Sequence, residues 1–120
     1  MVESKQIIEL AEQIVREHHP EQVILFGSYA YGTPNDNSDV DLLVILPFKG
    51  QPARKAAHIL QTINISPRFS IDLLARTPEQ VRQRLEQEDF FMRQVIESGK
   101  VLYETAYPFP VQGYPSRVSR

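Results

Sequence analysis

Two short apolar runs, each followed by a turn-forming residue, constrain the fold of this chain most strongly. Residues 23–26 stop at a Gly-Ser pair, and the largely apolar residues 40–46 stop at a proline. Runs of about four to eight such residues between breaks are typical of buried strands and are short for helices. Residues 70–75 predict a third strand, and residues 101–103 predict a short fourth one.

Segments with helical periodicity separate these strands. Apolar residues recur every three or four positions in three segments, which therefore predict helices: residues 4–18, 53–63 and 77–98. We expect Ala57, Leu60 and Ile63 to face the core, and a single helical turn over residues 28–31 closed by Gly32. The third helix would begin with a capping box of Thr77 and Gln80 and bend near Gln87. This alternation predicts an α/β or α+β domain in which helices flank a small sheet of about four strands. A parallel sheet fits the order, but strands this short favour a mixed sheet.

The composition of the 120-residue chain fits one globular domain. Hydrophobic residues make up 42% and charged residues 23%, which excludes a wholly disordered chain. Residues 107–120 contain three of the nine prolines. We therefore expect a domain over residues 1–106 followed by an extended, proline-rich tail.

Charge and residue usage exclude several classes of function. Thirteen basic and fifteen acidic residues give a formal net charge of −2, so direct nucleic-acid binding is not expected. The chain has no cysteine, which excludes disulfide scaffolds, thiolate zinc sites and cysteine nucleophiles. No apolar run approaches the roughly 20 residues of a membrane span, and the first residues lack the apolar stretch of a signal peptide. We expect a cytoplasmic protein with no membrane partner.

Asp39 and Asp41 give the first indication of chemistry. Side chains alternate along a strand, so residues two apart share a face and lie about 7 Å apart. Two carboxylates at the mouth of an apolar strand repel each other and lose hydration, and a divalent cation would compensate both effects. Oxygen ligands suit Mg²⁺, which takes one or two carboxylates together with substrate phosphates.

Gly27 and Ser28 offer a matching site for phosphate. Backbone N–H groups exposed at the start of a helical turn bind anions, glycine allows close approach, and the Ser28 hydroxyl adds a donor. Asp72 would join the acidic cluster if its predicted strand lies beside the strand of Asp41. Two metal ions about 4 Å apart could then activate an attacking oxygen and stabilise the leaving one.

This pattern resembles the signature of a known enzyme family. Gly27-Ser28, ten intervening residues and then Asp39-Val40-Asp41 are similar to the motif of the DNA polymerase β-like nucleotidyltransferases, in the minimal nucleotidyltransferase branch. The resemblance covers residues 23–103, and it implies the palm fold of that superfamily.

The resemblance also implies roles for the residues of the motif. Gly27 and Ser28 would hold the β- and γ-phosphates of ATP, and Asp39 and Asp41 would bind two Mg²⁺ ions. Asp72 would bind one of these ions and help to deprotonate an acceptor hydroxyl. The reaction would move a nucleoside monophosphate onto that hydroxyl and release pyrophosphate, with catalysis mostly by positioning and charge neutralisation.

One departure from the family pattern lies directly after the Gly-Ser pair. Many relatives carry arginines there, whereas this chain has Tyr29 and Tyr31. The missing positive charge would lower nucleotide affinity, unless Arg54, Lys55 or Arg76 supplies it.

Small members of this branch are often antitoxins paired with a HEPN-domain toxin, and they can attach AMP to a tyrosine of that toxin. The resemblance therefore implies a toxin partner in a hetero-oligomer, with AMP transferred from ATP. Two alternatives stay open: a non-catalytic antitoxin that neutralises the toxin by binding, and an enzyme that acts on a small hydroxylated molecule such as an aminoglycoside.

The same residues also have purely structural interpretations. Asp39, Asp41 and Asp72 could be solvated carboxylates at strand ends, and Ser28 could only cap the helical turn. For residues 90–91, both phenylalanines, we expect one side chain in the core and one available to a partner.

Overall fold

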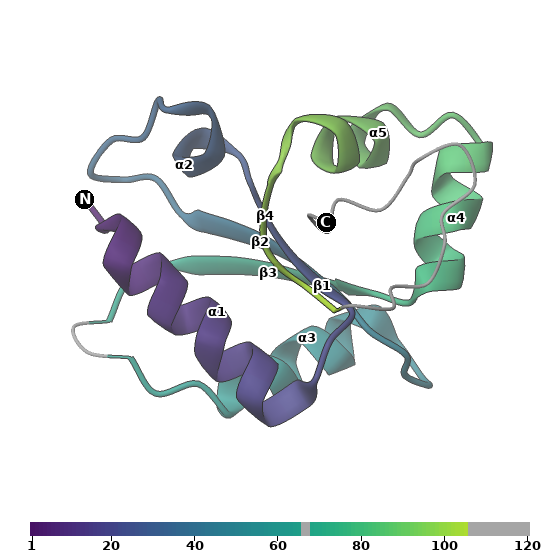
Figure 1. The fold of residues 1–120 in the computed structure, drawn as a ribbon, viewed down its shortest axis with the longest axis horizontal. Helices are drawn as coiled ribbons and strands as arrows, with labels where there is room; N and C mark the ends of the chain where they lie inside the picture. The colour runs from purple at the N-terminus through teal and green to yellow at the C-terminus, as the bar shows by residue number, and fades with distance from the viewer. Residues whose placement is uncertain (66–67, 106–120) are drawn as a thin grey trace.

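A mixed four-stranded sheet forms the centre of the computed structural model, which describes residues 1–65 and 68–105 (Figure 1). The strand order is β3–β2–β1–β4, with β1 antiparallel to β2 and β4, and β2 parallel to β3. The strands are β1 Gln22–Phe26, β2 Val40–Ile45, β3 Ile71–Arg76 and β4 Lys100–Glu104. The predicted mixed sheet of about four strands is confirmed. The predicted tail, residues 107–120, lies outside the described residues, so the division at residue 106 stays a prediction.

Helices cover both faces of this sheet (Figure 1). In chain order they are α1 Ser4–His18, α2 Ser28–Tyr31, α3 Pro52–Gln61, α4 Pro78–Glu86 and α5 Phe90–Ser98. The α1–α3 face and the α4–α5 face each enclose a separate apolar core. The short α2 lies at the end of β1. None of the described helices is long and apolar enough to cross a membrane.

Strand β2 is buried on both faces, which explains its nearly continuous apolar sequence. Val40, Leu42 and Val44 belong to the core of the α1–α3 face, whereas Leu43 and Ile45 belong to the core of the α4–α5 face. The odd-numbered side chains of β2 therefore lie on the α4–α5 face of the sheet, and Asp41 is one of them.

The predicted helix over residues 77–98 is two helices, so the expectation of one bent helix is wrong. It begins as expected with a capping box, in which Thr77 and Gln80 hydrogen-bond each other's backbone N–H. The helical conformation ends after α4, where Glu88 has a left-handed φ of 58°. A new cap then forms because the Asp89 carboxylate accepts a hydrogen bond of 2.9 Å from the Met92 N–H.

Helix α3 presents a different face to the core than expected. Ala57 is exposed and Leu60 is 36% exposed, so both expectations are wrong, and Ile59 is fully buried instead. Ile63, as expected, is partly buried and packs against the core of this face, and so does Ala56. Both sets of positions have helical spacing, and packing against β3 selects between them.

Candidate active site

The parallel pairing of β2 with β3 brings two of the predicted aspartates together. Asp41 and Asp72 are partners in the register of these strands. Leu43 and Leu74, two residues further along each strand, pack in the core of the α4–α5 face. Because alternate residues share a face, Asp41 and Asp72 both lie on this side of the sheet. Asp39 is exposed just before β2 begins, so all three carboxylates lie at one end of the sheet.

The electrostatics of Asp41 reflect this grouping. Burial raises the pKa of the Asp41 carboxyl above its usual range, and the neighbouring charges of Asp72 and then Asp39 raise it further. In the part of the chain that the structure describes, no cation pairs with any of the three carboxylates. Their mutual repulsion is therefore uncompensated, which is the condition that favours a bound cation.

Gly27 directly follows β1 and lies against the carboxylate of Asp41. It has a left-handed φ of 74°, and a Cβ atom there would overlap Oδ2 of the Asp41 carboxylate. Only glycine fits a position with both features. The backbone of the Gly-Ser turn and the carboxylate of Asp41 are thus in direct proximity, although they lie far apart in the sequence.

Ser28 is the first residue of α2 and is half-buried. The cap position of α2 belongs to Gly27, and no side chain caps this turn. The structural interpretation of Ser28 as the capping residue is therefore wrong. At the other end of the turn, Gly32 has a left-handed φ of 80° and closes α2 as expected.

The donor set suits a hard divalent cation. All three side chains are carboxylates, and oxygen donors are what Mg²⁺ prefers. Within residues 1–65 and 68–105, however, no group of three or more His, Asp or Glu side chains is gathered so that it could hold a metal ion. The residues thus fit an ion that takes one or two carboxylates and completes its shell with phosphate oxygens and water, and they do not form a closed protein cage.

The predicted substitutes for the missing arginines lie away from the aspartates. Arg76 pairs with Ile45 at the far end of β3, four residues from Asp72 and hence about 13 Å along the strand. Burial, and after it the nearby charge of Lys55, lowers the pKa of His18, which places Lys55 close to His18. His18 ends α1 shortly before β1 begins, at that same far end. Arg54 is the sequence neighbour of Lys55.

Sequence reasoning missed Arg68. This exposed arginine lines a surface pocket of about 750 Å³ that also includes Asp39. The N-terminal segment with α1, helix α2, the turn after α2 and the segment before β3 contribute its other lining residues, among them Gln6, Tyr29, Ser38 and Ser70. The sequence offered only a positional signal: Arg68 lies three residues before β3 begins and four before Asp72, and therefore near the aspartate end of the sheet.

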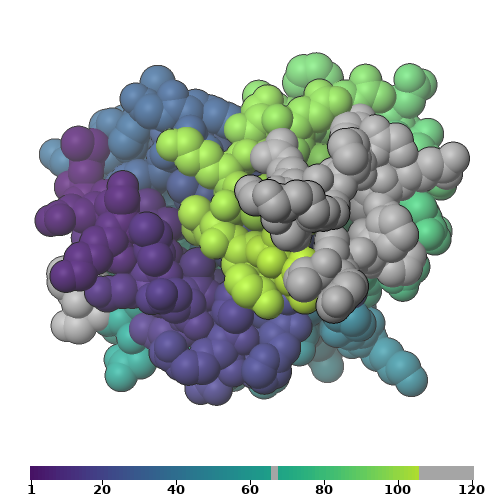
Figure 2. Space-filling model, viewed as in Figure 1, coloured from purple at the N-terminus to yellow at the C-terminus, as the bar shows by residue number. Residues whose placement is uncertain are grey.

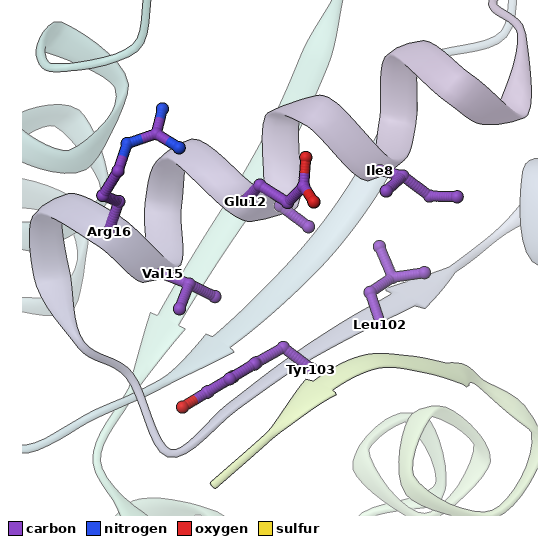
Figure 3. Close-up of a pocket in the computed structure, with 7 residues that line it drawn as sticks. Ile8, Glu12, Val15, Arg16, Leu102 and Tyr103 are labelled. Carbon is purple, nitrogen blue, oxygen red and sulfur yellow. The ribbon is translucent and has the colours of Figure 1, made fainter.

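A second groove of about 500 Å³ lies between α1 and β4 (Figure 3). Ile8 and Leu102 face each other across it, and the side chains of α1 and β4 lie side by side on this face of the molecule (Figure 2). Its lining contains none of the three aspartates. We place the candidate site at the aspartates because they combine converging charges with a shifted pKa.

Comparisons with known proteins agree with this placement of elements. Residues 5–107 match the family model described as Polymerase beta, Nucleotidyltransferase. A solved structure from Sulfolobus solfataricus, assigned as a nucleotidyltransferase, is 18% identical with a TM-score of 0.57, and the match covers 89% of this chain and 85% of that one. A mutant of the toxin–antitoxin MntA–HpeT is 20% identical with a TM-score of 0.51, covering 88% and 76%.

A third solved structure, a toxin–antitoxin with AMP-PNP, is 20% identical with a TM-score of 0.49 and covers 82% of this chain and 74% of its own. No curated protein is significantly similar to the chain.

Proposed function

The chain belongs to the polymerase beta nucleotidyltransferase family, and from that premise we propose that it transfers AMP from ATP to a hydroxyl group of a partner protein. One observation carries the proposal: Asp41 and Asp72 are register partners on one face of the sheet, beside the Gly27 turn. This arrangement supports the proposal because it brings carboxylates and a glycine turn together at one end of the sheet.

The proposed transfer assigns a separate task to each part of this site. The backbone of Gly27 and the hydroxyl of Ser28 bind the β- and γ-phosphates, which orients the α-phosphorus toward the acceptor. The acceptor oxygen forms a bond to the α-phosphorus, and the bond from that phosphorus to the bridging β-phosphate oxygen breaks. Pyrophosphate leaves, and Asp72, which is exposed, accepts the proton of the hydroxyl.

Asp39, Asp41 and Asp72 are the residues that would hold Mg²⁺, and we propose two ions. When bound, the metal supplies positive charge for the triphosphate and for the attacking oxygen. The residues themselves supply only oxygen donors at one end of the sheet. The pKa of Asp41 is raised by burial and then by repulsion from Asp72 and Asp39, and such a charge would relieve that repulsion.

We propose that the partner is a HEPN-domain toxin and that a tyrosine of this toxin accepts the AMP, so that the chain acts as an antitoxin. Two features support this choice. A toxin–antitoxin, MntA–HpeT, is among the structures of similar fold, and the described part of the chain is a small palm with few elements beyond the sheet and its helices. A partner would then supply most of the acceptor surface.

Transfer of labelled AMP tests the proposal. The chain is incubated with Mg²⁺, ATP labelled on the α-phosphate and the toxin, and the wild type is compared with Asp39→Ala and Asp41→Ala. Glu9→Ala is the matched control, because Glu9 is an exposed acidic residue on α1. We expect label on the toxin with the wild type and with Glu9→Ala, and a loss of at least a hundredfold with either aspartate variant.

Other results would favour the alternatives. Neutralisation of the toxin that survives both aspartate substitutions, without label, would contradict AMP transfer and favour inhibition by binding. Label that appears on an aminoglycoside but never on protein would contradict the protein acceptor.

A further inference from the structure

Helix α5 begins with two exposed aromatic side chains. Phe90 is 79% exposed and Phe91 is 44% exposed, so the expectation that one of them lies in the core is wrong. Phenylalanine is usually buried, and two adjacent exposed rings near a candidate site call for a functional explanation.

Phe91 is held against the aspartate end of the sheet. Its ring contacts the ring of Phe26 edge-on, with centroids 5.5 Å apart and planes at 84°. Phe26 is 8% exposed, packs in the core of the α4–α5 face and is the last residue of β1 before Gly27. It is also the register partner of Asp41, which places the Cα atoms of these two residues about 5 Å apart.

The position of Phe91 is fixed from its own helix as well. The carboxylate of Asp89 caps α5 through the Met92 N–H and lies 3.0 Å from the Arg84 guanidinium. Phe91 is therefore anchored at the start of a capped helix on one side and by the Phe26 ring on the other. A large part of it stays exposed on the α4–α5 face, which is also the face of the carboxylates.

We propose that Phe91 is the stacking platform for the nucleobase of the nucleoside triphosphate, an inference that rests on the proposed function. With the phosphates at Gly27 and Ser28, the nucleoside extends from the turn that directly follows Phe26. A purine or pyrimidine presents a flat π-face, and stacking on an aromatic ring is tolerant of which base it is. Phe91 thus contributes affinity for the nucleoside and little discrimination between ATP and GTP.

The affinities of two ligands, one with a base and one without, separate the contribution of the base from that of the phosphates. Calorimetry measures ATP and inorganic tripolyphosphate, each with Mg²⁺, on the full chain. We expect Phe91→Leu to weaken ATP binding about tenfold or more and to leave tripolyphosphate binding unchanged, because tripolyphosphate has no base. The matched control is Phe90→Leu, the adjacent and more exposed ring, which should change neither affinity.

A fluorescence measurement covers the case in which Phe91→Leu is unstable. The chain contains no tryptophan, so Phe91→Trp introduces a single reporter and keeps an aromatic face. We expect ATP and GTP to quench this fluorescence, and we expect tripolyphosphate not to do so.

Each contrary result has a distinct meaning. If the wild type binds neither ligand, the proposed function itself fails. If the wild type binds both and Phe91→Leu keeps full affinity for ATP, the base lies elsewhere and only the platform is overturned. Equal losses for both ligands, or a loss of toxin binding with unchanged ATP binding, would likewise overturn it.

Discussion

Gly27 is the residue at which the local backbone and the proposed site depend on each other most directly. An alanine there would meet two costs: the backbone strain of φ 74° with ψ −159°, a region that only glycine occupies readily and that costs other residues about 1–3 kcal/mol, and overlap with the Asp41 carboxylate. Gly32 has φ 80° with ψ 21°, in the left-handed helical region, and nothing lies within 4 Å of its Cβ position, so an alanine there meets a smaller backbone cost and no overlap.

We predict that Gly27→Ala lowers the free energy of unfolding by more than Gly32→Ala does, and that Gly27→Ala also reduces nucleotide binding. Chemical denaturation of both variants measures the difference. Equal losses of stability would contradict the close approach of Gly27 to Asp41.

Asp41 gives a pH prediction at the same scale. Its pKa is higher in the folded chain than the ordinary value of 3.8, chiefly through burial and then through Asp72 and Asp39. Between the ordinary pKa, which applies to the unfolded chain, and the raised pKa of the folded chain, the folded state binds more protons. The free energy of unfolding therefore falls as the pH rises through this window. Above it, ionised Asp41 destabilises the metal-free fold.

We predict that Asp41→Asn raises the thermal stability of the metal-free chain at pH 7 and has little effect at pH values below 3.8. Thermal unfolding with a chelator present, across this pH range, tests the prediction, and Glu9→Gln on the exposed face of α1 serves as the control. A stabilisation that does not change with pH would show that the charge of Asp41 is not its cause.

At the scale of elements, short local signals were easier to interpret than long periodic ones. Thr77 and Gln80 predict a capping box that the structure confirms, and the turn over residues 28–31 is where it was expected. Periodicity alone could not select Ile59 over Leu60 in α3, because both stripes repeat at helical spacing. It also missed the break before α5, which depends on an Asp89 cap that the apolar pattern does not contain.

The break between α4 and α5 leads to a prediction about its capping residue, Asp89. The N–H of Met92 and then the guanidinium of Arg84 hold the pKa of the Asp89 carboxyl below its usual range, so this carboxylate stabilises the fold above the ordinary pKa and loses that effect as the pH falls through the lowered one. We predict that Asp89→Ala lowers Tm at pH 7, and that the deficit shrinks in strong acid. Glu86→Ala, an exposed change at the end of α4, should leave Tm nearly unchanged, and equal effects of the two would contradict the cap.

At the scale of the whole molecule, the sequence predicted the family but only part of the geometry. The motif around Gly27 and Asp41 predicted a nucleotidyltransferase, and the family is confirmed. The meeting of Asp41 with Asp72 depended on which strands are neighbours, and that is set by the packing of all the helices on the sheet. The same dependence explains why Arg68 was overlooked and why Arg76 was wrongly considered. The roles of the site residues stay predictions.

The central claim is that the aspartates of two neighbouring strands bind one metal–nucleotide complex, and stabilisation by Mg²⁺ with ATP tests it most directly. A ligand that binds only the folded chain stabilises it by about 2.7 kcal/mol at 100 times its Kd. We predict a clear rise in Tm for the wild type, a much smaller rise for Asp41→Asn and for Asp72→Asn, and no further loss when the two are combined, because both act on one site. A full rise in Tm for Asp72→Asn, or additive losses in the double variant, would contradict a shared site.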